Sequence, residues 1–236
     1  MFLLIGGGHA AMTFAGIEQL SIDTGKAGIV SALLMRPAQP RACFVLAHGA
    51  GAGMRHASME AIAAGLAERG IATLRYQFPY MEKGGKRPDP PAVAHAAVRA
   101  AVAEAGRRRA GLKLIAGGKS FGGRMTSLAQ AAAPLAGVSG LAFLAFPLHP
   151  AGKPSTERAT HLAEIKIPML FLQGTRDALA ELSLLEPVVQ GLGPRATLHL
   201  AGEADHSFHV AARSGRNNRE VLAEILDAFA AWTDAI

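Results

Sequence analysis

The feature of this 236-residue sequence that most constrains its fold is a regular alternation of strand-like and helix-like segments, which begins near Ile17. Apolar and β-branched runs bounded by Gly or Pro alternate with Ala-rich segments in which apolar residues recur every three or four positions. The predicted strands are residues 18–24, 29–36, 42–47, 71–78, 112–116, 138–146, 169–173 and 196–201, and the predicted helices are residues 54–69, 89–105, 121–132, 161–165, 182–192 and a last one from 220. The first two strands form an expected antiparallel hairpin. We therefore predict an α/β fold with a mostly parallel eight-stranded sheet and helices on both faces.

The length and composition predict one domain. Half of the residues are hydrophobic, which is enough for a sizeable core, and a chain of 236 residues lies within the range of single domains. No repeat and no Gly- or Pro-rich tract divides the chain. Strand-like patterning starts only near Ile17, and Met12 could equally be the initiator. Residues 1–12 are therefore interpreted as a disordered or misassigned leader, and residues 13–236 as the domain.

Charge and cysteine content exclude several classes of function. The 24 Lys and Arg exceed the 18 Asp and Glu, for a net charge of +6, but the basic clusters at 83–87 and 107–109 carry no interleaved aromatic side chains, so nucleic-acid binding is not expected. The apolar run at the amino terminus is too short to span a membrane. The one cysteine, Cys43, excludes an internal disulfide and fits a reducing compartment. We expect a cytoplasmic monomer or homodimer without nucleic-acid or membrane partners.

Residues 118–122, Gly-Lys-Ser-Phe-Gly, match the G-x-S-x-G nucleophile elbow, and they lie between a predicted strand and a predicted helix. In this motif a sharp turn raises the serine hydroxyl above the sheet, and the glycines leave room for the chain to pass itself. The adjacent helix N-terminus favours a developing negative charge. The same pattern also arises by chance in turns, so the assignment of Ser120 as nucleophile depends on its partners.

Two partners of Ser120 follow later strands. Asp177 comes after the predicted strand 169–173, and His206 comes after the predicted strand 196–201. The carboxyl ends of strands are where open α/β sheets build their sites, and the order Ser, Asp, His is that of the nucleophile-elbow enzymes. His206 is the predicted general base, and Asp177 is predicted to orient its ring. Asp205 is the less favoured acid, because a residue adjacent to His206 can rarely face its Nδ1.

An acyl-transfer site also needs two N–H donors for the oxyanion. The backbone N–H of Phe121, which follows the nucleophile, is the predicted first donor. The second is expected from the small-residue loop after strand 42–47, with Ala50 preferred over Gly51. In the same loop His48 is more simply explained as a residue that braces the loop than as a catalytic one.

Other motifs were weighed and set aside. Gly118-Lys119-Ser120 ends like a Walker A loop, but Lys113 occupies the position where that motif needs its first glycine. The glycines near Gly49 lack the third glycine of a dinucleotide fingerprint, because Met54 stands there. The nine histidines show no zinc-enzyme spacing with carboxylates. We therefore predict neither a cofactor nor a metal.

The motifs AHGAGAGMRH, GGKSFGGRM, PMLFLQGTRD and EADHSF resemble those of the α/β-hydrolase superfamily. More narrowly, the chain resembles the dienelactone-hydrolase-like branch and a group of small bacterial proteins related to the hydrolase-like domain of a chromatin-complex scaffold subunit. The similarity spans nearly the whole chain from about Ile17. This similarity implies the sheet, the triad positions and the absence of a cofactor. It does not indicate which substrate is used.

Two departures from relatives matter. Dienelactone hydrolases proper carry a cysteine nucleophile, whereas this elbow carries Ser120, so their reaction is not implied. The residues between the predicted strands 138–146 and 169–173 are too few for a cap domain. The pocket is therefore expected to be open. Its candidate lining residues are His48, Tyr76, Phe78 and His149, and plain loop packing is an equally good explanation for them.

Three functions remain in competition. The leading hypothesis is a serine hydrolase that cleaves a carboxylic ester or thioester, a small-molecule substrate, through an acyl-enzyme on Ser120. An amidase or peptidase would use the same triad. The alternative from another class is a non-catalytic interaction module on the same fold. Relatives that act as scaffolds can lack the triad, and this chain retains every member of it, which favours catalysis.

Overall fold

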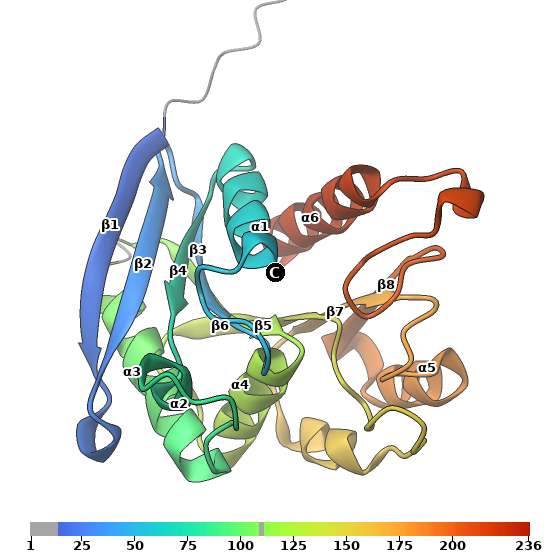
Figure 1. Ribbon diagram of the computed structural model, residues 1–236, viewed down its shortest axis with the longest axis horizontal. Coiled ribbons are helices and arrows are strands. Elements are labelled where there is room, and N and C mark those ends of the chain that lie inside the picture. The colour runs from blue at the N-terminus through green and yellow to red at the C-terminus, as the bar shows by residue number, and fades with distance from the viewer. Residues whose placement is uncertain (1–13, 109–110) are drawn as a thin grey trace, which may run out of the picture.

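The computed structural model describes residues 14–108 and 111–236, and its centre is one twisted sheet (Figure 1). The strands are β1 (Phe14–Asp23), β2 (Ile29–Pro37), β3 (Ala42–Ala47), β4 (Ile71–Tyr76), β5 (Lys113–Lys119), β6 (Val138–Leu144), β7 (Met169–Gly174) and β8 (Ala196–Ala201), in the order β1-β2-β4-β3-β5-β6-β7-β8. The β1/β2 and β2/β4 pairs are antiparallel, and every pair from β4 to β8 is parallel. The predicted fold class is confirmed.

Helices cover both faces of the sheet. α1 (Ala57–Glu68) and α6 (Asn218–Ala235) lie on one face, and α3 (Pro91–Arg108), α4 (Phe121–Ala132) and α5 (Leu182–Gly191) lie on the other (Figure 1). The buried strand β3 shows how the two cores arise. Phe44 and Leu46 pack with the first pair of helices, whereas Cys43 and Val45 pack with the second group, because side chains alternate between the faces of a strand. All-apolar strands such as β3 are typical of a parallel sheet that is covered on both sides.

Several element boundaries differ from the prediction. The first strand begins at Phe14 rather than near Ile17, the first long helix begins at Ala57, and α6 begins at Asn218. The strands predicted to end at 78 and 146 end at Tyr76 and Leu144. The second of these stops early because Ala145 turns the chain with a φ of 58°, which a strand does not accommodate. The leader assigned to residues 1–12 lies outside the described residues.

Asp89, which starts the predicted helix 89–105, precedes α3 in the structure and bonds to another helix. Asp89 accepts a hydrogen bond from Tyr80 N at 2.8 Å, so it closes the start of the short helix α2 (Pro79–Glu82). The backbone carbonyl of Pro90 accepts the first bonds of α3, from Val93 and Ala94. The prolines still suit this opening, because the first helical positions need no backbone donor.

The segment between β6 and β7 contains little regular structure. It forms a single 3₁₀ helix, Glu157–Glu164, which overlaps the short helix predicted at 161–165 and begins earlier. The described part of the chain therefore contains no cap domain, as predicted. Within the same residues, no helix is both long enough and apolar enough to cross a membrane.

Candidate active site

The turn from β5 into α4 holds Ser120 in a strained backbone conformation. Its φ is 49° and its ψ is −117°, a region that residues with a side chain rarely occupy. The backbone N of Ser120 donates to Leu144 O at 3.0 Å, which fixes the turn against β6. The glycines of the motif are required by close approach. A Cβ at Gly118 would lie 2.3 Å from Ala47 O, and one at Gly122 would lie 2.6 Å from the same oxygen.

Ser120, His206 and Asp177 form a continuous chain of hydrogen bonds. Ser120 Oγ lies 2.8 Å from His206 Nε2, and His206 Nδ1 lies 2.7 Å from Asp177 Oδ2. A carboxylate accepts only, so Nδ1 carries the ring proton and Nε2 presents its lone pair to the serine hydroxyl. This tautomer is the one that a general base needs. The loops after β5, β7 and β8 bring the three residues together, at the carboxyl ends of their strands.

The Asp177 carboxylate is itself held in place by other donors. Its side chain is fully buried, and it accepts from Gln173 Nε2 and, at 2.8 Å, from Leu179 N. Gln173 also accepts from Phe146 N at 2.9 Å, so it links the acid to the end of β6. Sequence reasoning missed Gln173. The only available signal was a polar residue at the end of an apolar strand.

Asp205 has the role of a turn residue. Its Oδ1 accepts from Ser207 N at 2.7 Å and from His209 N at 2.9 Å. The carboxylate therefore braces the loop that carries His206. This placement agrees with the preference for Asp177.

Of the three residues expected to supply N–H groups for an oxyanion, Ala50 and Gly51 line a cleft at Ser120, and Phe121 is the chain neighbour of Ser120. Phe121 is the first residue of α4, so its N–H has no acceptor within the helix. Ala50 and Gly51 both line the cleft, and Tyr80 Oη donates to Ala50 O at 2.7 Å, which fixes the direction of this loop. The cleft has a volume of about 430 Å³, within the range that holds small-molecule ligands.

The four pocket residues predicted from the sequence do not line this cleft. His48, Tyr76, Phe78 and His149 are all completely buried, which corrects that prediction. The remaining walls come from His56, Ser58, Met59, Lys119 and Leu179, in addition to Ala52 and Ser207.

The two buried histidines brace loops. His48 Nε2 accepts from Phe78 N at 3.0 Å, and its Nδ1 lies 2.7 Å from Gly49 O. Burial lowers the pKa of His48 to about 4, so the ring stays neutral at neutral pH. His149 has the same arrangement, because its Nε2 accepts from Glu181 N and its Nδ1 lies 2.9 Å from Pro150 O.

Lys119, the residue before the nucleophile, ties the elbow to the loop of the base. Its Nζ donates to His206 O at 2.8 Å and lies 5.1 Å from the centre of the Phe208 ring. Burial lowers the pKa of the Lys119 ammonium to about 8, against attraction from Asp177 and Asp205. Phe208 has a φ of 62°, an outlier for a bulky residue that the loop must hold in place.

A second serine and histidine pair, Ser127 and His161, lacks the features of a catalytic pair. Ser127 Oγ lies 2.8 Å from His161 Nε2, but the hydroxyl is buried and donates to Arg124 O at 2.9 Å. The histidine is therefore the donor to the serine and cannot remove its proton. Burial, with smaller contributions from the charges of Arg124 and His95, lowers the pKa of His161 to about 4.

The described part of the chain contains no cluster of side chains suited to bind a metal ion. Residues 14–108 and 111–236 contain no group of three His, Cys, Asp or Glu side chains that could hold an ion. The Cys43 thiol is buried in the sheet, and burial raises its pKa to about 11, so it stays protonated. It is therefore not a competing nucleophile.

A family model described as an alpha/beta hydrolase domain matches residues 40–234. Among solved structures, the dienelactone hydrolase of Anabaena variabilis has a TM-score of 0.73 at 18% identity, covering 92% of this chain and 96% of that chain. An α/β serine hydrolase without lid from Xanthomonas campestris has a TM-score of 0.69 at 21% identity, covering 92% and 97%. An α/β serine hydrolase homologue from Coxiella burnetii has a TM-score of 0.70 at 20% identity, covering 89% and 97%.

At these identities the structural likenesses concern the fold. They agree with the resemblance to the dienelactone-hydrolase-like branch, and they do not show the narrower relation to a chromatin-complex subunit. The family model covers most of the chain and includes the elbow, Asp177 and His206. The chain belongs to the alpha/beta hydrolase domain family.

Proposed function

We propose that the protein is a serine hydrolase that cleaves a carboxylic ester or thioester through an acyl-enzyme on Ser120. The observation that carries the proposal is the chain of hydrogen bonds from Ser120 through His206 to Asp177, which opens onto a cleft of about 430 Å³. A serine hydroxyl is too weak an acid to attack an ester unaided, and a neutral imidazole at hydrogen-bond distance supplies the missing base.

Acylation transfers one proton and forms one covalent bond. His206 Nε2 takes the proton of Ser120 Oγ as this oxygen attacks the carbonyl carbon. The carbonyl oxygen becomes an oxyanion, which accepts from Phe121 N–H and from a second N–H of the loop at Ala50 and Gly51. His206 then gives its proton to the departing alcohol or thiol, and the acyl group remains on Ser120.

Deacylation repeats these steps with water. His206 Nε2 removes a proton from the water, whose oxygen attacks the acyl carbon, and the same proton returns to Ser120 Oγ. Three donors hold the buried Asp177 carboxylate in place throughout. It stabilises the imidazolium that forms in each half of the reaction.

The test is labelling with a fluorophosphonate probe together with hydrolysis of p-nitrophenyl acetate and a matched thioester. We expect both the label and the turnover to disappear in Ser120→Ala, and turnover to disappear in His206→Ala. Ser127→Ala is the matched control, because Ser127 also contacts a histidine but is buried. It should keep label and turnover.

A folded wild type that takes no label and hydrolyses neither substrate would refute the proposal. That result would favour the interaction module with an idle triad. If wild type is active instead, the ratio of ester to thioester turnover identifies the preferred substrate class.

A further inference from the structure

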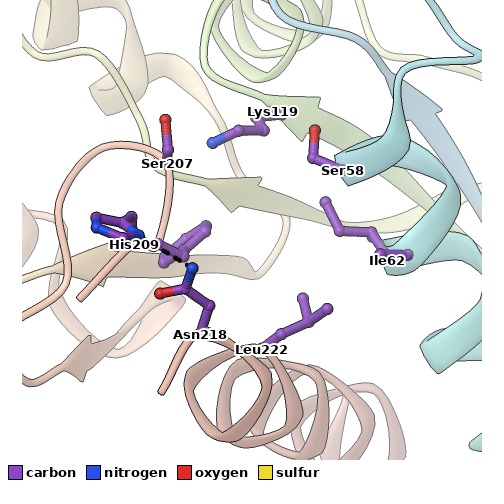
Figure 2. Close-up of a pocket in the computed structure, with 9 residues that line it drawn as sticks. Ser58, Ile62, Lys119, Ser207, His209, Asn218 and Leu222 are labelled. Carbon is purple, nitrogen blue, oxygen red and sulfur yellow. Dashed lines mark hydrogen bonds between the residues drawn. The ribbon is translucent and has the colours of Figure 1, made fainter. Parts of the chain in front are cut away.

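A second cavity lies beside the cleft, between α1, α6 and the loop that follows His206 (Figure 2). Its volume is about 260 Å³, which is below the range of about 300–1,000 Å³ that holds a whole drug-sized ligand. An apolar cavity of about 150 Å³ is known to hold benzene. The space beside Ser120 therefore suits one ring or a short alkyl chain, and it suits a part of a substrate better than a complete one.

The cavity joins the cleft through shared walls. Ser58, Lys119 and Ser207 line both hollows, and two of them are direct chain neighbours of Ser120 and His206. These three side chains therefore form the boundary that a group attached to the ester has to cross to enter the cavity. Residues 49–52 line the cleft and do not line the second cavity, so this cavity lies away from the loop expected to bind the oxyanion.

Four lining residues of the cavity are apolar. Ala61 and Ile62 come from α1, Phe208 from the loop after the base, and Leu222 from α6. Figure 2 shows Ile62 and Leu222 projecting from their two helices into the same space. Ile62 and Phe208 are almost completely buried, and the strained φ of Phe208 holds its ring in the wall.

Two polar side chains of the same walls, Asn218 and Lys119, have partners within the protein. Asn218 Nδ2 lies 3.0 Å from His209 Nδ1, and Asn218 Oδ1 accepts from Val210 N at 2.9 Å (Figure 2). The Lys119 ammonium donates to His206 O, so its charge is engaged by the loop of the base. A ligand therefore gains more here from apolar burial than from polar contacts.

We infer that this cavity is a subsite for an apolar substituent of the ester, a short unbranched alkyl chain or a single ring, and that it sets the substrate size. The inference rests on the proposed hydrolase. The substituent belongs either to the acyl group or to the alcohol, which share this chemistry, and two substrate series distinguish them.

The experiment measures kcat/KM across both series. One series lengthens the acyl chain of p-nitrophenyl esters from acetate to hexanoate, and the other lengthens the alcohol of alkyl acetates from ethyl to hexyl. Each methylene that enters the cavity should raise kcat/KM about fourfold, so butyrate should exceed acetate by about fifteenfold if the acyl chain is the occupant.

Three variants tie the effect to this cavity. Ala61→Phe places a ring into the space from an exposed position of α1, so the ratio of long to short esters should fall to about one. Leu222→Ala enlarges the space, so the optimum should shift to longer chains. Ala231→Phe is the matched control, because Ala231 is exposed on α6 and lines neither hollow. Thermal unfolding of each variant verifies its fold.

The outcomes distinguish failure of the proposed subsite from failure of the proposed hydrolase activity. If acetate is hydrolysed and the chain-length profiles are flat, or are the same in Ala61→Phe as in wild type, the subsite is refuted and the hydrolase stands. If wild type neither hydrolyses acetate nor takes the fluorophosphonate label, both proposals fall.

Discussion

Replacement of Gln173 by Leu should weaken both the fold and the catalysis, and a second glutamine separates the two effects. Gln173 is buried, its Oε1 accepts from Phe146 N at 2.9 Å, and its Nε2 donates to Asp177 Oδ2. Gln130 is also buried, and its Oε1 accepts from Leu135 N at 2.8 Å, without any link to Asp177. Both variants therefore leave one backbone N–H without its acceptor.

The magnitudes follow from these bonds. A buried N–H without a partner costs about 1–3 kcal/mol, which applies to Gln130→Leu and Gln173→Leu alike. A hydrogen bond to a charged group contributes about 1.5–3 kcal/mol, and only Gln173→Leu loses one. With about 2–4 °C per kcal/mol for a chain of this size, Gln173→Leu should melt at least about 3 °C below Gln130→Leu.

Catalysis should distinguish the variants more sharply. Without the Gln173 amide, the Asp177 carboxylate loses a donor on the same oxygen that accepts from His206, so the imidazole is less firmly oriented. We expect kcat to fall about tenfold to a hundredfold in Gln173→Leu and to stay unchanged in Gln130→Leu, measured with p-nitrophenyl acetate. Equal kcat values in two folded variants would refute the reasoning that Gln173 positions the acid.

Two further predictions concern the elbow. Gly118→Ala should lower the thermal stability and abolish turnover, because its Cβ would lie 2.3 Å from Ala47 O. Gly51→Ala is the control and should remain as stable as wild type, because Gly51 has open space around it. A stable, active Gly118→Ala variant would contradict this account. Lys119→Met should change the pH dependence of stability. Lys119 titrates near 10.5 unfolded and at about 8 folded, so between these values the unfolded chain binds the extra proton and wild type gains stability as pH rises. The free energy of unfolding, measured with denaturant at pH 7 and pH 10, should rise with pH in wild type and not in Lys119→Met. Equal rises in both proteins would contradict the lowered pKa of Lys119 in the folded state.

The order and type of the long elements could be predicted from the sequence because their periodicities are strong. The strands at 42–47 and 196–201 and the helix at 121–132 agree with the structure at both ends. Ends defined by a single backbone turn could not be predicted. The φ of Ala145 depends on its bond to Leu172 O in the neighbouring strand, which no local pattern encodes.

The candidate triad could be predicted from the sequence because each member lies in the turn or loop that follows a strand. The structure brings Ser120, His206 and Asp177 within hydrogen-bond distance, and their catalytic role stays a prediction. The residues that line the cleft could not be predicted from the sequence. Whether Phe78 faces the cleft or the core depends on its packing against Tyr76 and Phe121, and an aromatic residue after a strand fits either environment equally well.

The separation of Ser120 from His206 along the chain also determines when the site can exist. The two residues are 86 positions apart, and the loop of the base follows β8, which pairs within the described sheet only with β7 at its edge. During synthesis the elbow and its helix are therefore complete well before the base is available. A nascent chain that has folded through β7 carries a serine without a general base, so it cannot be acylated by the proposed route. In refolding experiments, recovery of turnover would accordingly report the docking of the last strand, whereas circular dichroism would report the formation of the bulk of the sheet.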